Sequence, residues 1–373
     1  MLNPIKNMLI QGDNIQGLLY LLNEKNLKAK IDLVYIDPPF ATNANFTISG
    51  GRAATISNSK NGNIAYSDKL TGKDFIEFLR KRLVLLNDLL SVQGSIYLHI
   101  DYKIGHYVKV LMDEIFGIEN FRNDITRIKC NPKNFDRIGF GNVKDLILFY
   151  TKSSSPIWNE PREEYTKKDI EKLFSKIDNQ GRRYTTVPIH APGETGNGKS
   201  NQPFKGIIPP KGRHWRTDVE TLEQWDKEGL IEWSSTGNPR KIIFADERQG
   251  KRVQDIWEFK DPQYPSYPTE KNSDLLDLII STSSNPGSIV LDCFCGSGTT
   301  LKSAQLLGRR WIGIDQSDYA IKATVEKLET INEPLFCLEA EPEYEFVNIG
   351  KKNIYKLPRN MRSDGDLLHV NTA

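Results

Sequence analysis

The sequence predicts an α/β fold with a mostly parallel sheet, interrupted by one inserted region. Short apolar runs typical of buried strands alternate with helix-like segments over residues 8–150, and the same alternation returns over residues 273–325. Strands that alternate with helices in this way form parallel sheets. Residues 153–267 lack sustained periodicity and are rich in Gly, Pro, Trp and basic side chains. We therefore expect the two periodic portions to share one sheet, with an insert between them.

The first portion contains signals for four strands and three helices. Asp13 follows a short apolar run and precedes a helix-like segment, so it is placed to cap that helix. Pro38 and Pro39 end the second apolar run, because proline cannot donate to a sheet ladder. Strands are expected at residues 8–10, 31–36, 95–100 and 145–150, and helices at residues 14–22, 73–90 and 104–116.

The second portion continues the alternation. Helices are expected at residues 273–282, 299–307 and from about 318, and strands at residues 288–291 and 310–314. The stretch Ser153-Ser154-Ser155-Pro156 is a plausible linker into the insert. The polar tail after residue 332 is expected to be partly disordered. The predicted division is a main domain at 1–152 and 268–332, an insert at 153–267, and a C-terminal extension at 333–373.

Composition restricts the class of protein without identifying it. The 373 residues carry a formal net charge of +2, so attraction to a polyanion has to come from local clusters of basic side chains. Cys293 and Cys295 are two of only four cysteines and lack the spacing of a zinc site, so no metal is expected. Few cysteines, no signal peptide and no run near the ~20 apolar residues of a membrane span predict a cytoplasmic protein without membrane contact.

A first strand-end loop carries groups suited to an exocyclic amine on a base. Asp37, Pro38, Pro39 and Phe40 directly follow the apolar run at residues 31–36. They offer a carboxylate, a carbonyl left free because the next residue is proline, and a ring that can stack on a base. The loop therefore indicates chemistry at an amino nitrogen.

A second strand-end loop is rich in glycine and follows residues 288–291. Gly296 and Gly298 stand where a strand turns into a helix, so the backbone can approach a nucleoside-bearing ligand without a Cβ in the way. Asp315 ends the next predicted strand, where an acidic residue can accept hydrogen bonds from ribose hydroxyls. A P-loop would need a lysine that is missing here, and a dinucleotide fingerprint would need a third glycine where Leu301 stands.

Together these motifs resemble those of the DNA amino-methyltransferases, which move a methyl group from S-adenosylmethionine to N6 of adenine or N4 of cytosine. The tetrapeptide precedes the glycine loop, an order similar to the β group of the family, which includes type III modification subunits and many type II enzymes. Residues 269–272 and 307–315 complete a resemblance that covers roughly residues 8–325. It implies a Rossmann-like methyltransferase fold with a circularly permuted motif order.

The resemblance implies a set of residues for S-adenosylmethionine. Asp315 would hold the ribose, and Asp13 would read the adenine amine unless it only caps its helix. Thr269 and Lys271 match the segment that supports the carboxylate end, although the family often has Gln and Pro at positions 270 and 272, and Lys271 could instead be solvated. The methionine moiety is assigned to Asp292, Phe294, Gly296, Gly298 and Thr299.

The tetrapeptide implies direct attack by the base nitrogen. Hydrogen bonds from the amine to Asp37 and to the Pro38 carbonyl would localise its lone pair, while Phe40 stacks on the base. No thiol nucleophile is needed, and no cysteine lies in a Pro-Cys loop, so methylation at a ring carbon is not expected. A duplex substrate implies base flipping. Residues 41–68 are expected to form a mobile lid or a disordered surface insertion.

The insert matches the target-recognition region of the family. Its basic side chains can neutralise phosphates and some arginines can read guanine edges, although any single one is more often a solvated surface residue. Aromatic side chains lie among them, at Tyr184, Trp215, Trp225 and Trp233. The DNA-binding candidates are Arg182, Arg183, Lys199, Lys205, Lys211, Arg213, Arg216, Arg240 and Lys241.

The sequence thus predicts a site-specific DNA methyltransferase that acts on N6 of adenine. An acidic first residue in the tetrapeptide favours adenine, whereas serine is common in cytosine-N4 enzymes of the family. Cytosine N4 is the nearest alternative, and a catalytically silent DNA-binding subunit or a methyltransferase for RNA or protein are further ones. The expected partners are DNA, a second copy of the chain, and a separate restriction endonuclease subunit, since no nuclease or helicase motif is recognisable here.

Overall fold

The computed structural model describes residues 6–39, 45–49, 52–53, 63–67, 72–132, 136, 138–193, 198–263, 270–331 and 344–349. The chain divides into two compact units, one formed by Met1–Pro161 with Gln254–Ala373 and the other by Arg162–Val253. The second unit is narrower than the predicted insert because both flanks of that insert pack on the first unit. The Ile157 N–H donates to the Gln93 carbonyl (3.0 Å), and β17 (Ile256–Glu258) pairs with β7 (Phe121–Ile128).

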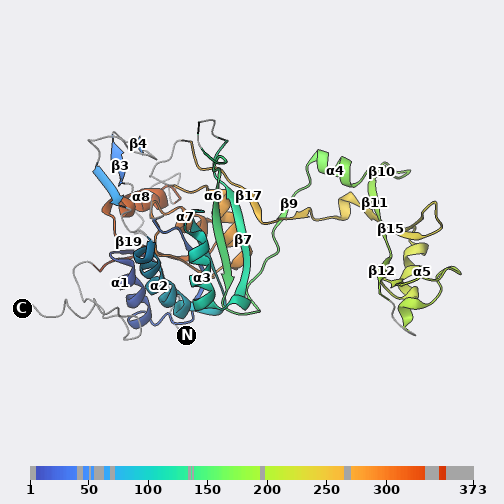
Figure 1. The fold of residues 1–373 in the computed structure, drawn as a ribbon, viewed down its shortest axis with the longest axis horizontal. Helices are drawn as coiled ribbons and strands as arrows, with labels where there is room; N and C mark the ends of the chain where they lie inside the picture. The colour runs from blue at the N-terminus through green and yellow to red at the C-terminus, as the bar shows by residue number, and fades with distance from the viewer. Residues whose placement is uncertain are drawn as a thin grey trace, which may run out of the picture. The chain divides into compact units, whose positions relative to one another are not determined.

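The first unit (Figure 1) is built on a nine-stranded sheet, whose strands follow the order β17-β7-β8-β6-β2-β18-β19-β1-β20. Neighbouring strands are parallel except where β8 pairs with β6 and β7. The predicted α/β fold with a mostly parallel sheet is therefore confirmed. The remaining strands are β1 (Asn7–Gln11), β2 (Ile31–Ile36), β6 (Leu90–Ile100), β8 (Lys144–Thr151), β18 (Ile289–Asp292), β19 (Arg310–Asp315) and β20 (Tyr344–Asn348).

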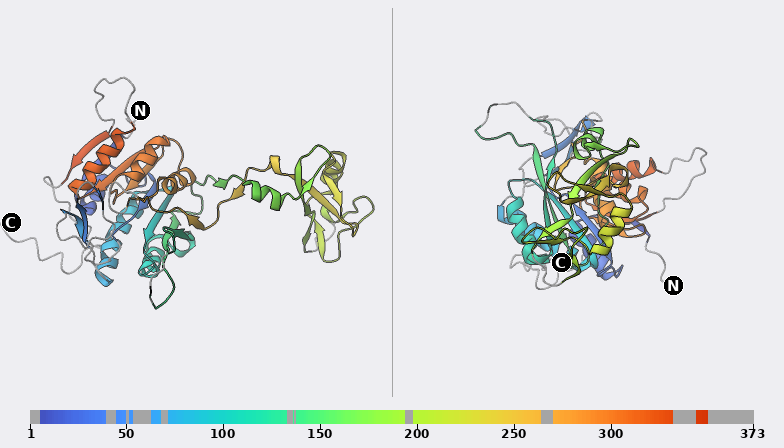
Figure 2. Two further views of the ribbon diagram at one scale, coloured as in Figure 1. Left: turned by 90° about the horizontal axis from the view of Figure 1, so that it is seen from above. Right: turned by 90° about the vertical axis from the view of Figure 1, so that its right-hand side faces the viewer.

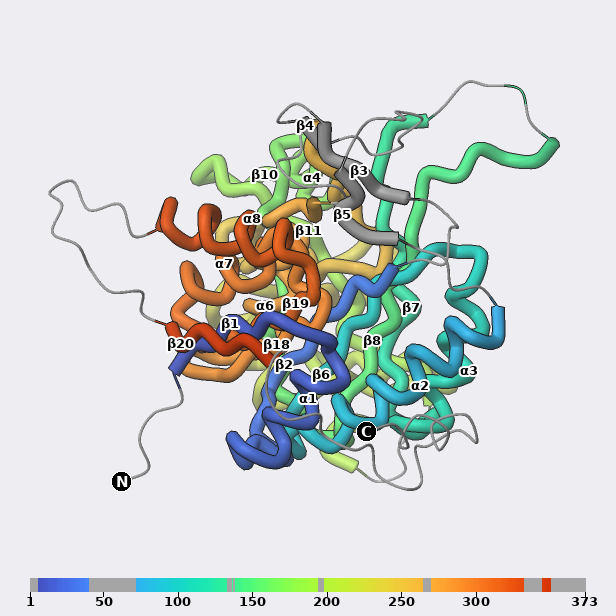
Figure 3. The backbone as a smooth tube through the Cα atoms, turned by 90° about the vertical axis from the view of Figure 1, so that its left-hand side faces the viewer, coloured from blue at the N-terminus to red at the C-terminus, as the bar shows by residue number. Residues whose placement is uncertain are grey.

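Two rows of helices cover the sheet. Helices α1, α2 and α3 pack against one another, as do α6, α7 and α8, and Figure 3 shows the rows on opposite sides of the strands. The largest apolar cluster joins Leu18 and Leu79 of the first row to Ile10 and Ile36 of the sheet. No helix in the described ranges is long and apolar enough to cross a bilayer. The bounds are α1 (Asn14–Asn23), α2 (Gly72–Leu89), α3 (Gly105–Phe116), α6 (Ser273–Ser283), α7 (Thr299–Leu306) and α8 (Asp318–Glu329).

The parallel strands bring the two predicted loops to one edge of the sheet. β2 ends directly before Asp37, β18 ends at Asp292 and β19 ends at Asp315. These three strands are direct neighbours in the order β2-β18-β19. Because the carboxyl ends of parallel strands lie at the same edge, the acidic loop and the glycine loop are adjacent although they are far apart in the sequence.

Two regions show structure beyond the predicted alternation. Within the tail, β20 pairs in parallel with β1 (Figure 3), which the sequence analysis did not anticipate because this short edge strand mixes polar and apolar residues. Within the predicted lid, β3 (Asn45–Ser49), β4 (Arg52–Ala53) and β5 (Asn63–Ser67) form a small antiparallel sheet. The rest of that lid lies outside the described residues.

The second unit has its own antiparallel sheet and apolar core (Figures 1 and 2). Its four-stranded sheet has the order β10-β11-β15-β14. Trp215 is fully buried with Ile189, Phe204 and Leu222, so this tryptophan serves the core. The elements are β9 (Arg162–Glu163), α4 (Lys167–Leu173), β10 (Lys176–Ile177), β11 (Arg183–Pro188), β12 (His190–Pro192), β13 (Arg213–Trp215), α5 (Val219–Lys227), β14 (Ile231–Trp233), β15 (Pro239–Phe244) and β16 (Lys251–Arg252).

Candidate functional site

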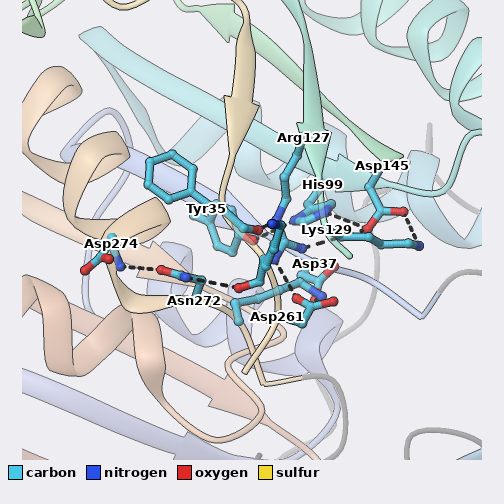
Figure 4. A network of polar contacts seen from close by, with 12 residues as sticks. Tyr35, Asp37, His99, Arg127, Lys129, Asp145, Asp261, Asn272 and Asp274 are labelled. Atoms are coloured by element: carbon cyan, nitrogen blue, oxygen red, sulfur yellow. Dashed lines mark hydrogen bonds and ion pairs between the residues drawn. The ribbon is translucent and has the colours of Figure 1, made fainter. Parts of the chain in front are cut away.

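Asp37 directly follows β2 (Figure 4). Among the described residues, one of its carboxylate oxygens is ion-paired and the other has no hydrogen-bond partner. Its Oδ2 lies 2.6 Å from the Lys271 ammonium, and the two side chains are only 16% and 11% exposed. Its Oδ1 is buried and has no hydrogen-bond partner among the described residues. Leaving a buried polar atom unpaired costs about 1–3 kcal/mol, more for a charged group. The position is therefore suited to a ligand that brings an N–H donor.

The structure describes two of the other three residues of the tetrapeptide. Pro38 is buried and Pro39 is half-buried directly after Asp37. Because proline has no N–H, neither residue can pair with a neighbouring strand through that group. Phe40 lies outside the described residues.

A buried polar network on β2, β6 and β8 lies next to Asp37 (Figure 4). The Tyr35 hydroxyl is 3.0 Å from His99 Nδ1, and His99 Nε2 is 3.3 Å from Asp145 Oδ2. A carboxylate can only accept, so the imidazole donates from Nε2 and accepts the Tyr35 O–H at Nδ1. Burial lowers the pKa of His99, which favours this neutral form. The chain of donors thus has a fixed direction, from Tyr35 to Asp145.

Cations complete this network and tie down the segment that returns from the second unit. Lys129 Nζ is 2.6 Å from Asp145 Oδ1. Burial alone would raise the pKa of Asp145, but the hydrogen bond with His99 and the Lys129 ammonium lower it overall. The fully buried Arg127 donates to the Phe259 carbonyl (2.8 Å) and to Asp261 Oδ1 (2.5 Å). The return segment is thereby held at the edge where Asp37 stands.

The glycine loop is shaped by Asp292 and by glycine geometry. Asp292 Oδ1 accepts the Phe294 N–H (3.0 Å) and Oδ2 accepts the Thr300 hydroxyl (2.6 Å). Gly298 has a φ of +74° and begins α7, and a Cβ there would lie 2.8 Å from Thr324. Glycine at position 298 is therefore required by its positive φ and by its contact with Thr324 of α8.

The pKa of the buried Asp292 carboxyl is shifted from its ordinary value. Burial raises its pKa to about 7, with the nearby carboxylates of Asp37 and Asp315 acting in the same direction, while the bonds from Thr300 and Phe294 oppose the rise. A buried carboxyl with a raised pKa is stabilised in its ionised form by a cationic ligand. A positive charge bound beside the loop would therefore lower the pKa of Asp292 again.

Asp315 and Asp13 were both predicted to contact the nucleoside part of the cofactor. Asp315 accepts the Gly296 N–H through Oδ2 and the Ser317 N–H through Oδ1, both at 2.9 Å. Burial raises the pKa of Asp315. Asp13 caps α1 by accepting the N–H groups of Ile15 and Gln16. The capping role that the sequence left open is therefore present, and the adenine contact stays a prediction.

The segment before α6 touches both loops. Lys271 contacts Asp37, while the preceding Glu270 forms an ion pair with Lys327 of α8. Lys327 Nζ also donates to Ser297 Oγ (2.9 Å) and Thr299 Oγ1 (2.8 Å) of the glycine loop. Asn272 caps α6, which explains an asparagine at a position where the family often has proline. Thr269 lies outside the described residues.

Cysteine chemistry is disfavoured in the glycine loop. Cys293 and Cys295 are buried, and burial raises the pKa of both thiols well above their ordinary value. A thiol that stays protonated is a poor nucleophile. Within the described residues, no group of three or more His, Cys, Asp or Glu side chains could hold a metal ion.

The basic side chains of the second unit fall into two groups. Several of them serve the unit itself: Arg182 pairs with Asp246, Lys205 pairs with Asp226, and Arg240 donates to Thr186. Lys241 lies over the Trp225 ring at 3.4 Å, Arg183 donates to the Phe174 carbonyl and Lys199 is 3.9 Å from Glu220. Lys211, Arg213 and Arg216 are exposed on or beside β13. The last three are the cations best placed to meet an external polyanion.

Sequence reasoning missed several residues of the site. Arg82 of α2 is buried, donates to Asn14 Oδ1 (2.6 Å), and lies over the Phe78 ring, with Asp13 at 3.5 Å. Burial lowers its pKa to about 10 although Asp13 acts in the opposite direction. Its position within the apolar face of α2 was the available signal. Nothing in the sequence pairs His99 with Asp145, or Lys327 with Glu270.

Known proteins resemble this chain over most of its length. The N6/N4 methyltransferase family model, described as DNA methylase, matches residues 31–326. The type II methyltransferase M.EcaI of Enterobacter cloacae is 39% identical over 363 residues, which cover 96% of this chain and 75% of that protein. The probable type III restriction-modification enzyme HindVI Mod subunit of Haemophilus influenzae is 26% identical over 88% of this chain, which spans about half (51%) of that subunit.

A solved structure shows a more distant likeness. The cytosine-N4-specific PvuII DNA methyltransferase is 14% identical, covers 88% of this chain and 92% of its own, and has a TM-score of 0.47. The family model extends over most of the chain, including both strand-end loops, and the first relative is similar along nearly the whole length. The chain therefore belongs to the N6/N4 DNA methylase family.

Proposed function

We propose that this DNA methyltransferase transfers a methyl group from S-adenosylmethionine to N6 of an adenine that is flipped out of its duplex. The observation that supports the target site is Asp37 Oδ1, a buried carboxylate oxygen without a hydrogen-bond partner among the described residues. An exocyclic amine supplies the N–H donor that this oxygen lacks. The family membership supports a methyl transfer to such an amine on DNA.

S-adenosylmethionine supplies an electrophilic methyl group on a sulfonium, and the residues of the glycine loop fit it. Asp315, whose carboxylate two backbone N–H groups hold at the end of β19, is proposed to accept hydrogen bonds from the ribose hydroxyls, and the backbone at Gly296 and Gly298 is proposed to admit the methionine moiety. The buried Asp292 carboxyl, whose pKa is raised to about 7, favours a ligand with positive charge. Thr299, Phe294, Asp13 and Thr269 complete the proposed cofactor residues.

The chain's own groups then orient the amine for attack. Asp37 Oδ1 and the Pro38 carbonyl accept hydrogen bonds from the two N–H groups of the amine. These bonds localise the lone pair on the nitrogen. The sulfonium would supply the methyl group, and Asp37 would stabilise the positive charge that develops on the attacking nitrogen until a proton leaves to solvent. Phe40 is proposed to stack on the base. Positioning of the two reactants supplies most of the acceleration.

Adenine is favoured over cytosine because the first residue of the tetrapeptide is acidic. The cytosine-N4 alternative uses the same amine geometry and remains the second candidate. The second unit is proposed to read the DNA sequence, with a homodimer and a separate restriction endonuclease as further partners. The proposal of a restriction endonuclease partner is supported by the similarity to a subunit of a type III restriction-modification enzyme.

The test is mass spectrometry of digested DNA after incubation with the protein and S-adenosylmethionine. N6-methyladenine supports the proposal, N4-methylcytosine moves the target base, and 5-methylcytosine or an unmodified product contradicts it. Asp37→Ala should abolish transfer while calorimetry shows nearly unchanged binding of S-adenosylmethionine, because the carboxylate is assigned to the amine. Near-normal turnover of the folded variant would remove Asp37 from the site.

A further inference from the structure

The consecutive residues Glu270 and Lys271 reach in two directions from the segment before α6. Lys271 pairs with Asp37 in the loop after β2. Glu270 pairs with Lys327, which also holds Ser297 and Thr299 of the glycine loop. All four charged side chains are largely shielded, with exposures of 11% to 16%. Two adjacent residues of opposite charge therefore connect the two loops whose ligands must meet.

We propose that Lys271 is a positioning residue for Asp37, because it orients the Asp37 carboxylate. We further propose that the ion pair between Glu270 and Lys327 fixes the position of Lys271. The proposal rests on the proposed function, because it concerns how Asp37 meets the target amine. It departs from the sequence expectation that Lys271 supports the carboxylate end of the cofactor.

The geometry of the carboxylate carries the first step. An aspartate in free rotation presents either oxygen, but the 2.6 Å contact with Lys271 fixes Oδ2 and leaves Oδ1 as the acceptor. The expectation of a merely solvated Lys271 is not supported, because the side chain is 11% exposed and ion-paired.

The second step is the anchorage of Lys271 itself. A lysine on a flexible segment would give a diffuse position, because its stem has several rotatable bonds. The neighbouring Glu270 is held by Lys327, and Lys327 is held in turn by two hydroxyls at the start of α7. Glu270 and Lys327, which are not among the proposed contacts of either ligand, would therefore fix the position of Lys271.

The decisive experiment is single-turnover methylation of duplex DNA at saturating S-adenosylmethionine, with cofactor affinity measured by calorimetry. Lys271→Met should slow the methylation step by about 100-fold, since a misplacement near 1 Å has effects of that size. Its dissociation constant for S-adenosylmethionine should stay within about threefold of the parent protein, near the error of such comparisons. Lys271→Arg, which keeps the charge, should recover part of the rate.

A matched control separates positioning from loss of a surface charge. The control residue is Lys322, which lies on α8 like Lys327, is 77% exposed and is 3.8 Å from Glu326. Lys322→Met should leave the methylation rate unchanged. Glu270→Gln and Lys327→Met should each slow methylation, and the double variant should be no slower than the worse single one, because both act through the same pair. Thermal unfolding of every variant verifies that it is folded.

The outcomes also distinguish this inference from the proposed function. If Lys271→Met weakens cofactor binding more than tenfold and methylates at the normal rate once saturated, Lys271 holds the cofactor and the positioning role is wrong. A parental rate with parental affinity contradicts it equally. If Lys271→Met does not fold, Lys271→Gln replaces it as the uncharged variant. Equal methylation rates of Lys271→Arg and Lys271→Gln would then contradict a role for the charge. A parent protein that methylates no DNA refutes the proposed function instead.

Discussion

At the scale of single residues, the site depends on carboxylates whose surroundings differ. Asp37 is held by a lysine, Asp315 accepts two backbone N–H groups, and Asp292 is buried with one backbone and one hydroxyl donor. Only the environment distinguishes these three aspartates, since each stands at the end of a strand of the same sheet. Their burial, rather than their residue type, assigns them to different tasks.

The raised pKa of Asp292 predicts a pH-dependent stability. Below the ordinary pKa of 3.8 both the folded and the unfolded chain bind this proton, so Asp292 has no effect. Between 3.8 and about 7 the folded protein keeps the proton and the unfolded chain loses it, so the free energy of unfolding falls as pH rises. Above about 7 the full penalty is present. Asp292→Asn removes this titration.

The measurement is thermal unfolding of both proteins across this range without cofactor. The melting temperature of Asp292→Asn should exceed that of the parent at pH 8, and the difference should shrink steadily towards pH 4. Asp32→Asn is a control carboxyl at the other end of the neighbouring strand β2. A difference that is constant with pH would show that Asp292 titrates at its ordinary pKa.

At the scale of elements, the strand β13 and its flanks carry three exposed cations of the second unit, Lys211, Arg213 and Arg216. Replacing Lys211 and Arg216 by Gln should weaken DNA binding at all sequences and reduce its salt slope by about one for each phosphate that is no longer neutralised. Cofactor affinity should not change, because both residues belong to the second unit. Fluorescence anisotropy at several salt concentrations measures the DNA affinity and its salt slope.

Arg240 provides the comparison for this prediction. Its Nε and Nη2 donate to the Thr186 hydroxyl and carbonyl at 2.8 and 2.7 Å, so Arg240→Gln should lower the melting temperature of the second unit. The salt slope of DNA binding should change little. If the Lys211 and Arg216 double variant bound DNA as the parent does, recognition would lie on other residues.

Elements differed in how far the sequence could predict them. The strand at Ile31–Ile36 was predicted with its observed bounds, because a continuous apolar run followed by two prolines leaves little choice. The strand β20 was not predicted, since it forms by pairing with β1, which is far away in the sequence. The same limit applies to the site: loop residues follow from local motifs, whereas the Glu270–Lys327 contact joins residues that no motif connects.

At the scale of the whole molecule, the second unit is one continuous segment whose ends meet. Its first strand β9 pairs with its last strand β16, so Glu163 lies opposite Lys251. It also has an apolar core of its own around Trp215. A segment with adjacent ends and its own core is expected to fold alone.

Residues 162–253 expressed alone should therefore unfold cooperatively, as followed by circular dichroism. The remaining chain, joined by a short Gly-Ser linker, should still bind S-adenosylmethionine, because both loops belong to the first unit. It should lose sequence-specific DNA binding. Loss of cofactor binding in a folded remainder would show that the second unit contributes to the cofactor site.

The strand order has a further consequence for the newly made chain. β2 is synthesised before the second unit, yet one of its two neighbours is β18, which follows the entire second unit. Until Ile289–Asp292 has been synthesised, β2 has one unpaired edge and an incomplete cover. The second unit, made in the meantime, can fold first because its contacts are local. The nascent protein is therefore expected to become protected from proteases in the middle before it does so at its N-terminus.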